Sequence, residues 1–533
     1  MAMARRALWS PWCLPVIVAG SLPFPRPAMP QAAALLPPPQ VASADMPVGV
    51  FYFPGWSREQ RWWCIEASAP TLHPLLGYYR EGDPVAADWH IKWALEHGVQ
   101  FFAFDYYIEG GGELLESALA DGFLKSRFID EFRFCLNWCN HAPAETQTRE
   151  EFAAFEDVVI DKYLKHASYL RIEGKPVVMI LAGYSFVKTL GVEGAREMFA
   201  AFDARCKAEG LNGVYLVFCE GGIVGQPAID DSLAAGCKAF CLYNYPYIGT
   251  SFTGPGQPGA EASYEDMVVQ GEGLWRHWRN VTKGAFWPTV MPGWDRRPWT
   301  KDRDLVRTGS TPELFERSLR AAREHVNADR IVMIEAWNEW GEGSSLEPSR
   351  EQGFAYLQKV REVFCPGAEP LEPQDPASLG LPLPSWDLKL PSETRWTFDF
   401  DNHGWTGARC TELLNRQGVL VTTTTTGDPA LSSPPNYVRC EEYGSVVLRM
   451  RLTPPEGETR TECTAQLFWS TVERQTCEEL GATFPAYLDG NWHTYTVDLA
   501  AEPAWTGTAD SLRLDPCDAP DIRVELDRVE FSR

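Results

Sequence analysis

Eight short apolar runs, each separated from the next by a segment with helical periodicity, dominate residues 48–345. Eight alternating β and α units in a stretch of this length predict a (β/α)8 TIM barrel. A doubly wound sheet is the alternative, but none of the runs is followed by a glycine-rich nucleotide turn such as GxGxxG or GxxxxGK[ST]. The eight runs begin at Val48, Val99, Phe132, Lys175, Gly213, Ala239, Phe286 and Arg330.

Polar and aromatic residues follow seven of the eight runs. In a barrel the carboxyl ends of all strands meet at one face, where active sites are built. Any one of these residues could be a packing or ion-pair residue, but together they predict a sugar-binding cleft. We expect aromatic contacts to substrate from Trp56, Tyr243, Tyr245 and Trp294, and hydrogen bonds from Asp105, Glu220 and Asp295. Strand alternation puts Tyr243 and Tyr245 on one face and Asn244 on the other, so only one of these sets should point inward.

The stretch EAWNEWGEGSSLEP at residues 335–348 follows the eighth run. A solvated acidic loop rarely contains two tryptophans, so we interpret it as a carboxyl pair beside aromatic rings, the chemistry of a glycosidase. Glu339 and Glu342 can converge because Gly341 and Gly343 permit tight turns. Desolvation by tryptophan would keep one carboxyl protonated as an acid, while the other, better solvated, acts as base or nucleophile. The alternative is that Glu339 is a buried structural residue.

The same stretch resembles the signature of glycoside hydrolase family 99 and of the related WbsX-like group. Weaker similarities support it: FYFPGW at 51–56, GYY at 77–79 followed by DP at 83–84, FFAFDYY at 101–107 and PGWD at 292–295. The resemblance covers about residues 48–365. The signature residues matched are Asn338, Glu339, Trp340, Glu342, Gly343, Glu347 and Pro348.

The resemblance implies a retaining α-mannosidase. In that family the first glutamate assists the substrate's 2-hydroxyl, giving a 1,2-anhydro sugar, and the second protonates the leaving oxygen. Carried over, Glu339 is the base, Glu342 is the acid, and Asn338 contacts substrate. Family 99 has histidine where this chain has Gly341. A small residue at this position is closer to the WbsX-like group, whose members are partly described as glycosyltransferases.

Neither a metal nor another cofactor is required by this chemistry, because carboxyls carry both roles. Two other functions stay open. A sugar-nucleotide glycosyltransferase would need a phosphate cradle or a DxD metal site, and Asp302-Arg303-Asp304 has that spelling but lies outside a strand end. A non-catalytic glycan-binding protein could use the same cleft.

The charge and the leader bear on partners and localisation. A net charge of −24 without a basic cluster argues against nucleic acid, whereas 21 Trp and 18 Tyr suit a polysaccharide or glycan partner. Residues 1–47 resemble a signal peptide: Arg5 and Arg6 precede an apolar run at 13–24, too short to span a membrane, and Ala42-Ser43-Ala44 resembles a cleavage site. We therefore expect a secreted or periplasmic protein, and we expect most cysteines to be small buried residues.

Three segments follow the leader: a catalytic barrel at 48–366, a Pro-rich linker or strap at 367–393, and a β-sandwich at 394–533. The last segment has alternating runs broken by Gly, Pro, Asn and Asp, and it resembles the carbohydrate-binding modules appended to glycan-active enzymes. Its tryptophans Trp405, Trp492 and Trp505 are either a sugar platform or part of the core.

Overall fold

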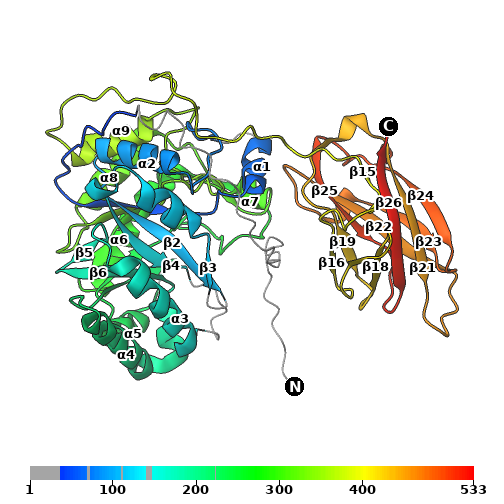
Figure 1. Ribbon diagram of the computed structural model, residues 1–533, viewed down its shortest axis with the longest axis horizontal. Helices are drawn as coiled ribbons and strands as arrows, with labels where there is room; N and C mark the ends of the chain where they lie inside the picture. Colours follow the sequence, from blue (N-terminus) through cyan, green and yellow to red (C-terminus); the bar gives the residue numbers. More distant parts are fainter. Residues whose placement is uncertain (1–35, 69–71, 110–111, 140–146, 223) are drawn as a thin grey trace. The chain divides into compact units, whose positions relative to one another are not determined.

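The structure is a computed structural model that describes residues 36–68, 72–109, 112–139, 147–222 and 224–533. Eight parallel strand positions form the central sheet, as the apolar runs predict (Figure 1). In spatial order the strands are β1 (Val48–Tyr52), β2 (Phe101–Glu109), β4 (Arg133–Trp138), β6 (Lys175–Leu181), β7 (Tyr215–Glu220), β8 (Ala239–Leu242), β10 (Phe286–Trp287) with β11 (Thr289–Val290), and β14 (Val332–Ile334).

Pro288 divides the seventh strand position, and the two halves pair with different neighbours. β10 pairs with β8, and β11 pairs with β14, which in turn pairs with β1. Proline has no N–H to give to a ladder, but the Pro288 carbonyl still accepts from the Met333 amide at 2.9 Å. The segment 286–290 therefore joins the two edges of the sheet, and the predicted (β/α)8 barrel is confirmed.

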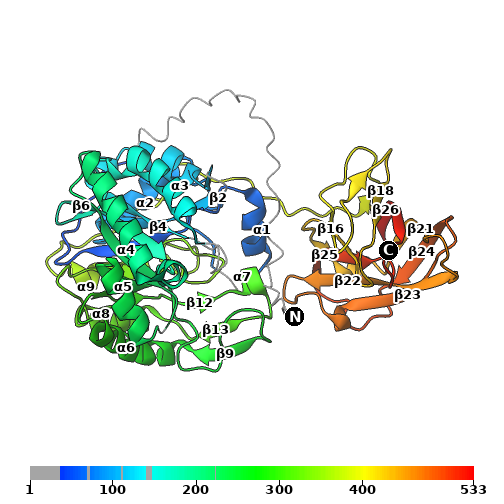
Figure 2. The same ribbon diagram turned by 90° about the horizontal axis from the view of Figure 1, so that it is seen from below.

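Helices lie outside the strands (Figure 2). Local signals set their starts: Thr148 and Glu151 form a capping box for α3, and the Thr311 hydroxyl accepts from the Leu314 amide before α8. The helices are α1 (Glu59–Ala67), α2 (Pro84–Glu96), α3 (Arg149–Val159), α4 (Tyr184–Ala208), α5 (Gln226–Ala235), α6 (Tyr264–Val281), α7 (Arg297–Thr300), α8 (Pro312–Arg323) and α9 (Ala355–Phe364).

A small three-stranded sheet holds the long loop that follows the seventh strand position. Its strands are β9 (Ala260–Ser263), β12 (Trp294–Asp295) and β13 (Leu305–Thr308), with β13 in the centre (Figure 2). The Arg307 guanidinium, 4% exposed, donates to the carbonyls of Pro246 and Ser263 and so ties this sheet to the loop after β8. Two short strands, β3 (Gly112–Leu114) and β5 (Arg171–Ile172), pair antiparallel with β2 and β6 respectively.

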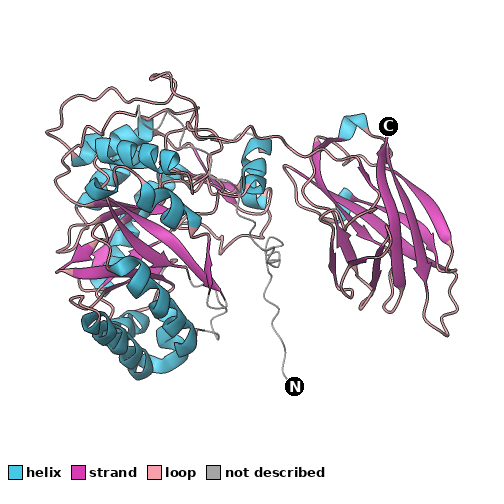
Figure 3. Cartoon of the chain, viewed as in Figure 1, coloured by secondary structure: helices cyan, strands magenta, loops and turns pink. Residues whose placement is uncertain are grey.

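The C-terminal part is all-β, with two antiparallel sheets around one core (Figure 3). β21 alternates half-buried and buried residues along its whole length, as a strand with one core face should. One sheet contains β15 (Arg395–Trp396), β17 (Leu414–Asn415), β18 (Leu420–Thr423), β21 (Ser445–Thr453), β24 (Trp492–Asp498) and β26 (Arg523–Ser532). The other contains β16 (Thr406–Ala408), β19 (Ala430–Ser432), β20 (Val438–Arg439), β22 (Glu462–Thr471), β23 (Gly481–Tyr487) and β25 (Thr508–Asp515).

The three sandwich tryptophans do not form a platform. Trp405 and Trp505 belong to the core, with 0% and 7% exposure. Trp492 lies on the outer face of its sheet, where the guanidinium groups of Arg449 and Arg451 stand 4.6 and 4.9 Å from its ring. The interpretation as core residues is therefore correct for Trp405 and Trp505.

Segments on either side of the barrel pack against it. The Gln374 carbonyl accepts from Trp93 Nε1 at 2.8 Å, and the Trp386 amide donates to the Tyr78 carbonyl at 2.8 Å, so the Pro-rich segment acts as a strap. Within the expected leader, residues 1–35 lie outside the described ranges, and the Ala42 amide donates to the Leu95 carbonyl at 2.9 Å.

Two expectations about the whole chain can be compared with the described ranges. Within those ranges, no helix is both long and apolar enough to cross a bilayer. Most of the cysteines there are buried, which confirms their interpretation as small core residues.

Candidate active site

The segment after β14 folds back over the carboxyl-terminal end of the barrel. The Ala336 amide donates to the Ser344 carbonyl at 2.9 Å, and the Leu346 amide returns to the Ala336 carbonyl at 2.8 Å. Gly343 has φ of 65°, the left-handed conformation that glycine adopts without cost. This loop carries both signature glutamates to the face where the strands end.

Glu347 holds this loop in place through buried hydrogen bonds. Its carboxylate, 2% exposed, accepts from Tyr79 Oη at 2.6 Å and Trp340 Nε1 at 3.2 Å, and lies 3.1 Å from His90 Nε2. The GYY motif and the Glu-Pro end of the signature therefore meet in one hydrogen-bonded cluster. These residues are buried and position the loop that carries Glu339 and Glu342.

Asn338 and Trp56, both predicted to contact substrate, make supporting contacts inside the protein. Both are 0% exposed. The Asn338 amide accepts from the Phe53 backbone N–H and donates to the Phe53 carbonyl, both at 2.9 Å. Trp56 donates from Nε1 to the Asn338 carbonyl and stacks between Trp62 and Trp299. Neither side chain has a face left for a sugar.

Gly341 is required by space and not by backbone conformation. A Cβ at this position would lie 1.8 Å from the Trp299 indole, far inside van der Waals contact. Trp299 belongs to α7, in the loop after the seventh strand position. The indole fills the volume that any side chain at 341 would need, which explains why this chain has glycine where family 99 has histidine.

Glu339, in the loop after β14, belongs to a hydrogen-bonded group with residues of β2, β4 and the segment after β8. Tyr243 Oη donates to Asp105 Oδ2 at 2.6 Å and lies 3.2 Å from Glu339 Oε1. Asn137 Nδ2 donates to Asp105 Oδ1 at 2.8 Å. Asp105, Glu339 and Asn137 are 2%, 6% and 0% exposed. The predicted residues Asp105, Tyr243 and Glu339 are thus brought together.

Glu342 faces a cation that the sequence analysis missed. Arg296 Nε lies 3.2 Å from Glu342 Oε1, and the same guanidinium reaches Asp304 Oδ2 at 3.3 Å. The Asn244 amide hydrogen-bonds the Glu342 carboxyl as well. Arg296 lies directly after the PGWD motif, which is the one sequence signal that could have pointed to it.

Glu335 adds a further buried carboxyl beside the pair. It follows β14 directly, is 0% exposed, and accepts from Ser344 Oγ at 2.7 Å through Oε1. Its Oε2 has no hydrogen-bond partner among the described residues. Glu335 opens the EAWNEWGEGSSLEP stretch, but neither Glu335 nor Asn137 or Asn244 was predicted from the sequence to be a site residue.

Burial raises the pKa of all four carboxyls in this cluster. The pKa of Asp105 is raised to about 7 by burial, against which the Tyr243 and Asn137 hydrogen bonds act. Burial and then the neighbouring Glu342 raise the pKa of Glu339 and of Glu335 far above the usual range. The pKa of Glu342 is raised by burial too, but Arg296 lowers it.

Arg296 distinguishes Glu342 from Glu339. We expected one desolvated and one better solvated carboxyl, and the exposures differ only modestly: Glu339 is 6% exposed and the Glu342 side chain 14%. Arg296 favours the ionised form of Glu342. Glu339 has no such partner among the residues described and holds a proton more readily.

Four other predicted substrate contacts lie outside this cluster: Glu220, Trp294, Asp295 and Tyr245. The Glu220 carboxylate accepts from the Tyr184 amide at 3.0 Å, and burial raises its pKa to about 7, but no contact joins it to the glutamate pair. The Asp295 carboxylate is bound by Arg297, and its backbone N–H donates to the Glu342 carbonyl at 2.6 Å. Trp294, 2% exposed, packs beneath the Arg296 guanidinium.

Tyr245 shows why the alternation argument failed. β8 ends at Leu242, so residues 243–245 are not extended strand. Tyr243 and Asn244 both reach the carboxyl cluster, whereas Tyr245 packs on Trp275 of α6. Tyr245 is not placed to contact a substrate beside Glu339.

Asp302-Arg303-Asp304 does not have the geometry of a metal-binding DxD motif. Asp304 is 3% exposed, and its carboxylate already accepts from Tyr247 Oη at 3.0 Å and from the Leu305 amide at 2.7 Å, besides pairing with Arg296. Among the described residues, no group of three or more His, Cys, Asp or Glu side chains could hold a metal ion. The Asp304 carboxylate instead supports Arg296.

Fold and site together define a (β/α)8 protein with a buried carboxyl cluster at the carboxyl-terminal face of its barrel. Residues 68–360, more than half of the chain, match the family described as "Glycosyltransferase WbsX", and the chain therefore belongs to the WbsX family. The strap and the sandwich lie beyond that match.

Curated relatives resemble the barrel part of the chain. The uncharacterized protein WxcX of Xanthomonas campestris pv. campestris is 23% identical over 319 residues, which are 55% of this chain and 43% of WxcX. The glycoprotein endo-alpha-1,2-mannosidase of Xenopus laevis is 22% identical over 296 residues, which are 54% of this chain and 60% of that enzyme. The chain thus spans about half the length of the curated relatives it matches.

Solved structures resemble each part separately. The GH99 endo-alpha-mannosidase from Bacteroides thetaiotaomicron superposes with a TM-score of 0.44 at 15% identity, covering 60% of this chain and 97% of that one. A carbohydrate binding module of family 29 covers 26% of this chain and 88% of that module, with a TM-score of 0.20 at 15% identity. The fold assignment comes from the strand order above and not from these superpositions.

Proposed function

We propose that the barrel is a retaining glycoside hydrolase that cleaves α-mannoside-type bonds in a polysaccharide or glycan. The observation that carries this proposal is the pairing of Glu339 and Glu342 in one buried cluster, with Arg296 beside only the second. Two carboxyls with raised pKa in one site can exchange acid and base roles during a reaction. The similarity to an endo-alpha-1,2-mannosidase supports the choice of sugar.

In the first step Glu339 takes the proton of the substrate's 2-hydroxyl while that oxygen attacks C1. Glu342 gives its proton to the glycosidic oxygen, the C1–O bond breaks, and a 1,2-anhydro sugar forms. In the second step Glu342 takes a proton from water, which attacks C1 and opens the ring. Glu339 returns its proton to the 2-oxygen. Two inversions at C1 give retention.

Arg296 has a defined part in this cycle. After the first step Glu342 is a carboxylate and Glu339 is protonated, and that is the proton distribution which Arg296 stabilises. The guanidinium therefore makes Glu342 a stronger acid, and the cycle starts from the less populated proton distribution, in which Glu342 holds the proton and Glu339 is ionised. The Tyr243 hydroxyl has one proton and two carboxyl neighbours, Asp105 at 2.6 Å and Glu339 at 3.2 Å. When Asp105 is protonated and donates to the Tyr243 oxygen, the Tyr243 hydroxyl can donate to Glu339 and stabilise the Glu339 carboxylate at the start of the cycle.

The test compares two glutamine variants on two kinds of substrate. Glu342→Gln should abolish cleavage of α-mannan, whose leaving group needs protonation, and should spare activated aryl α-mannosides in part, since a general acid contributes typically ~10²–10⁴-fold. Glu339→Gln should impair both, because the intermediate cannot form without it. NMR of the first-formed product should show the α anomer.

Asp329→Asn is a suitable control. Asp329 accepts from Tyr215 and Trp287 and lies just before β14, at the amino-terminal end of the strands, so activity should be unchanged. Sugar transfer to the glycan that occurs only with a nucleotide-sugar donor, with release of the nucleotide, would establish the glycosyltransferase suggested by the family's name. Tight binding of mannan without turnover would establish a glycan-binding protein. Full activity of either glutamine variant would remove that residue from the mechanism.

A further inference from the structure

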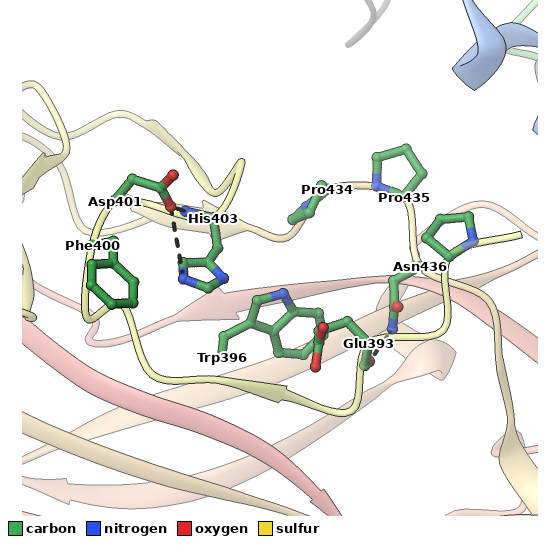
Figure 4. Close-up of a pocket in the computed structure, with 9 residues that line it drawn as sticks. Glu393, Trp396, Phe400, Asp401, His403, Pro434, Pro435 and Asn436 are labelled. Carbon is green, nitrogen blue, oxygen red and sulfur yellow. Dashed lines mark hydrogen bonds and ion pairs between the residues drawn. The ribbon is translucent and has the colours of Figure 1, made fainter.

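A pocket of about 400 Å³ lies in the sandwich, far along the chain from the barrel residues described above. It is formed where the segment 391–396, the loop 398–403 and the segment 434–436 approach one another (Figure 4). Its volume falls within the range of small-molecule sites, roughly 300–1,000 Å³. The residues that matter for its chemistry are Glu393, Trp396, Phe400, Asp401, His403 and Asn436.

Phe400 is the most exposed large apolar side chain described, at 93%. Its loop is nevertheless fixed: Asn415 Nδ2 donates to the carbonyls of Phe398 and Asp401, each at 2.6 Å. The His403 amide donates to Asp401 Oδ1 at 2.7 Å. The fold therefore holds an aromatic ring in solvent at the rim of a pocket, which is costly unless the ring has something to bind.

A buried polar group with an unused acceptor lines the same pocket. Asn436 is 4% exposed, and its Nδ2 donates to the Glu393 carbonyl at 2.8 Å. Its Oδ1 has no hydrogen-bond partner among the described residues. Buried amide oxygens are rarely left without a donor, because the lost hydrogen bond is costly. A ligand hydroxyl would supply one.

We propose that this pocket binds one pyranose residue of a neutral glycan. The ring of Phe400 offers a flat apolar surface for the C–H face of a sugar, and Asn436 Oδ1 accepts from a hydroxyl group. The carboxylates of Glu393 and Asp401 can accept from further hydroxyls. No Lys or Arg lines the pocket, so a uronate or phosphate would meet two negative groups without a cation.

This site is independent of the proposed catalytic function, because none of its residues belongs to the barrel cluster. It also differs from the outer sheet face around Trp492. There two guanidinium groups already stand over the indole ring. The Phe400 ring is covered by no such partner, since it is 93% exposed.

Affinity electrophoresis of the full chain tests the site, carried out in the Glu342→Gln background so that the gel polysaccharide stays intact. The probes are soluble α-mannan, xylan and β-glucan, with polygalacturonate as the anionic comparison. We expect retardation in at least one neutral gel and none in polygalacturonate. Phe400→Ala should weaken binding in that gel ~10-fold or more, as loss of a central aromatic anchor does.

Two further substitutions separate stacking from general apolar contact. Phe400→Trp should keep binding, and Phe400→Leu, which is apolar but has no ring, should lose it. Tyr487→Ala is the matched control, because Tyr487 is 45% exposed on β23 but does not line the pocket. Its retardation should equal that of the parent.

Several results would overturn the proposal. They are the absence of retardation in all neutral gels, full binding by Phe400→Leu, and equal loss in Phe400→Ala and Tyr487→Ala. Concentration-dependent self-association in the ultracentrifuge that Phe400→Ala abolishes would assign the pocket to a second copy of the chain instead. Binding lost in Phe400→Ala with an unchanged circular dichroism spectrum supports the sugar site.

Discussion

Replacing Asp105 by asparagine should make the barrel less sensitive to rising pH while it lowers activity. Asp105 is 2% exposed and accepts from Asn137 Nδ2 and Tyr243 Oη. Asparagine keeps the volume and can satisfy both neighbours, because its oxygen accepts from Asn137 and its amide donates to the Tyr243 hydroxyl. The substitution therefore removes a charge with little change in packing.

The magnitude follows from the pKa, which burial raises from 3.8 to about 7. A raised carboxyl pKa means that the folded protein keeps a proton which the unfolded chain has released, so stability falls as pH rises through this window. Each pH unit within the window costs about 1.4 kcal/mol. Between pH 5 and pH 7, allowing for partial ionisation near pH 7, wild type should lose about 2 kcal/mol more than Asp105→Asn.

Urea unfolding followed by tryptophan fluorescence gives the unfolding free energy of each protein at pH 5 and pH 7. The loss between the two pH values is then compared between wild type and Asp105→Asn. Asp88→Asn is a matched control: Asp88 is also 2% exposed, but its carboxylate binds Arg127 Nε at 2.7 Å and Ser126 Oγ at 2.7 Å. Breaking that pair should lower stability at both pH values. Equal pH dependence in wild type and Asp105→Asn would refute the reasoning about the buried carboxyl cluster. Unchanged turnover in Asp105→Asn would separate Asp105 from the mechanism.

Three further predictions concern the catalytic loop and its support. Arg296→Met removes the cation 3.2 Å from Glu342, so the pKa of Glu342 should rise. The basic limb of the plot of kcat/KM against pH should then move up by ~1–3 pH units. A basic limb that does not move would contradict the assignment of Glu342 as the acid. Gly341→Ala places a Cβ 1.8 Å from Trp299 and should cost ~1–3 kcal/mol of unfolding free energy, and combining it with Trp299→Ala should cost less than the sum of the two changes if the clash is the cause. Glu347→Gln replaces a charged acceptor of Tyr79 and Trp340 and should lower unfolding free energy by ~2–3 kcal/mol in urea titrations, with kcat falling only as the loop is displaced.

The barrel was predictable because each strand is a continuous apolar run that must be buried on both faces. The eight runs correspond to the eight strand positions, including the run that Pro288 divides. Short helices such as α5, with four buried residues in ten, carry too weak a periodic signal to be found this way. The sandwich was likewise visible from its alternation, but its tryptophans were ambiguous because core and platform residues share the same composition.

The site was predictable only as far as strand ends determine it. Asp105, Tyr243 and Glu339 lie at strand ends and meet as expected. Arg296 comes from a loop held by the small sheet β9–β12–β13, and nothing in a local pattern shows which side chain of such a loop folds back over the barrel. Tyr245 failed because the alternation rule was applied three residues past the end of β8. Loop geometry, and not strand pattern, therefore decides the electrostatics of this site.

The contact between Trp299 and Gly341 changes the chemistry at the position where family 99 has histidine. The family with histidine at this position places a titratable, polar ring next to its acid, whereas this chain places an indole there from a different element. An indole does not titrate, and Arg296 stays protonated, so we expect the pH dependence here to come from the carboxyls, with Arg296 lowering the pKa of Glu342. The Trp299 ring also stacks on Trp56, which bonds the Asn338 carbonyl just before Glu339. One tryptophan thus supports the loop just before Glu339 and again between Glu339 and Glu342, which ties the glycine in this signature to the packing of α7.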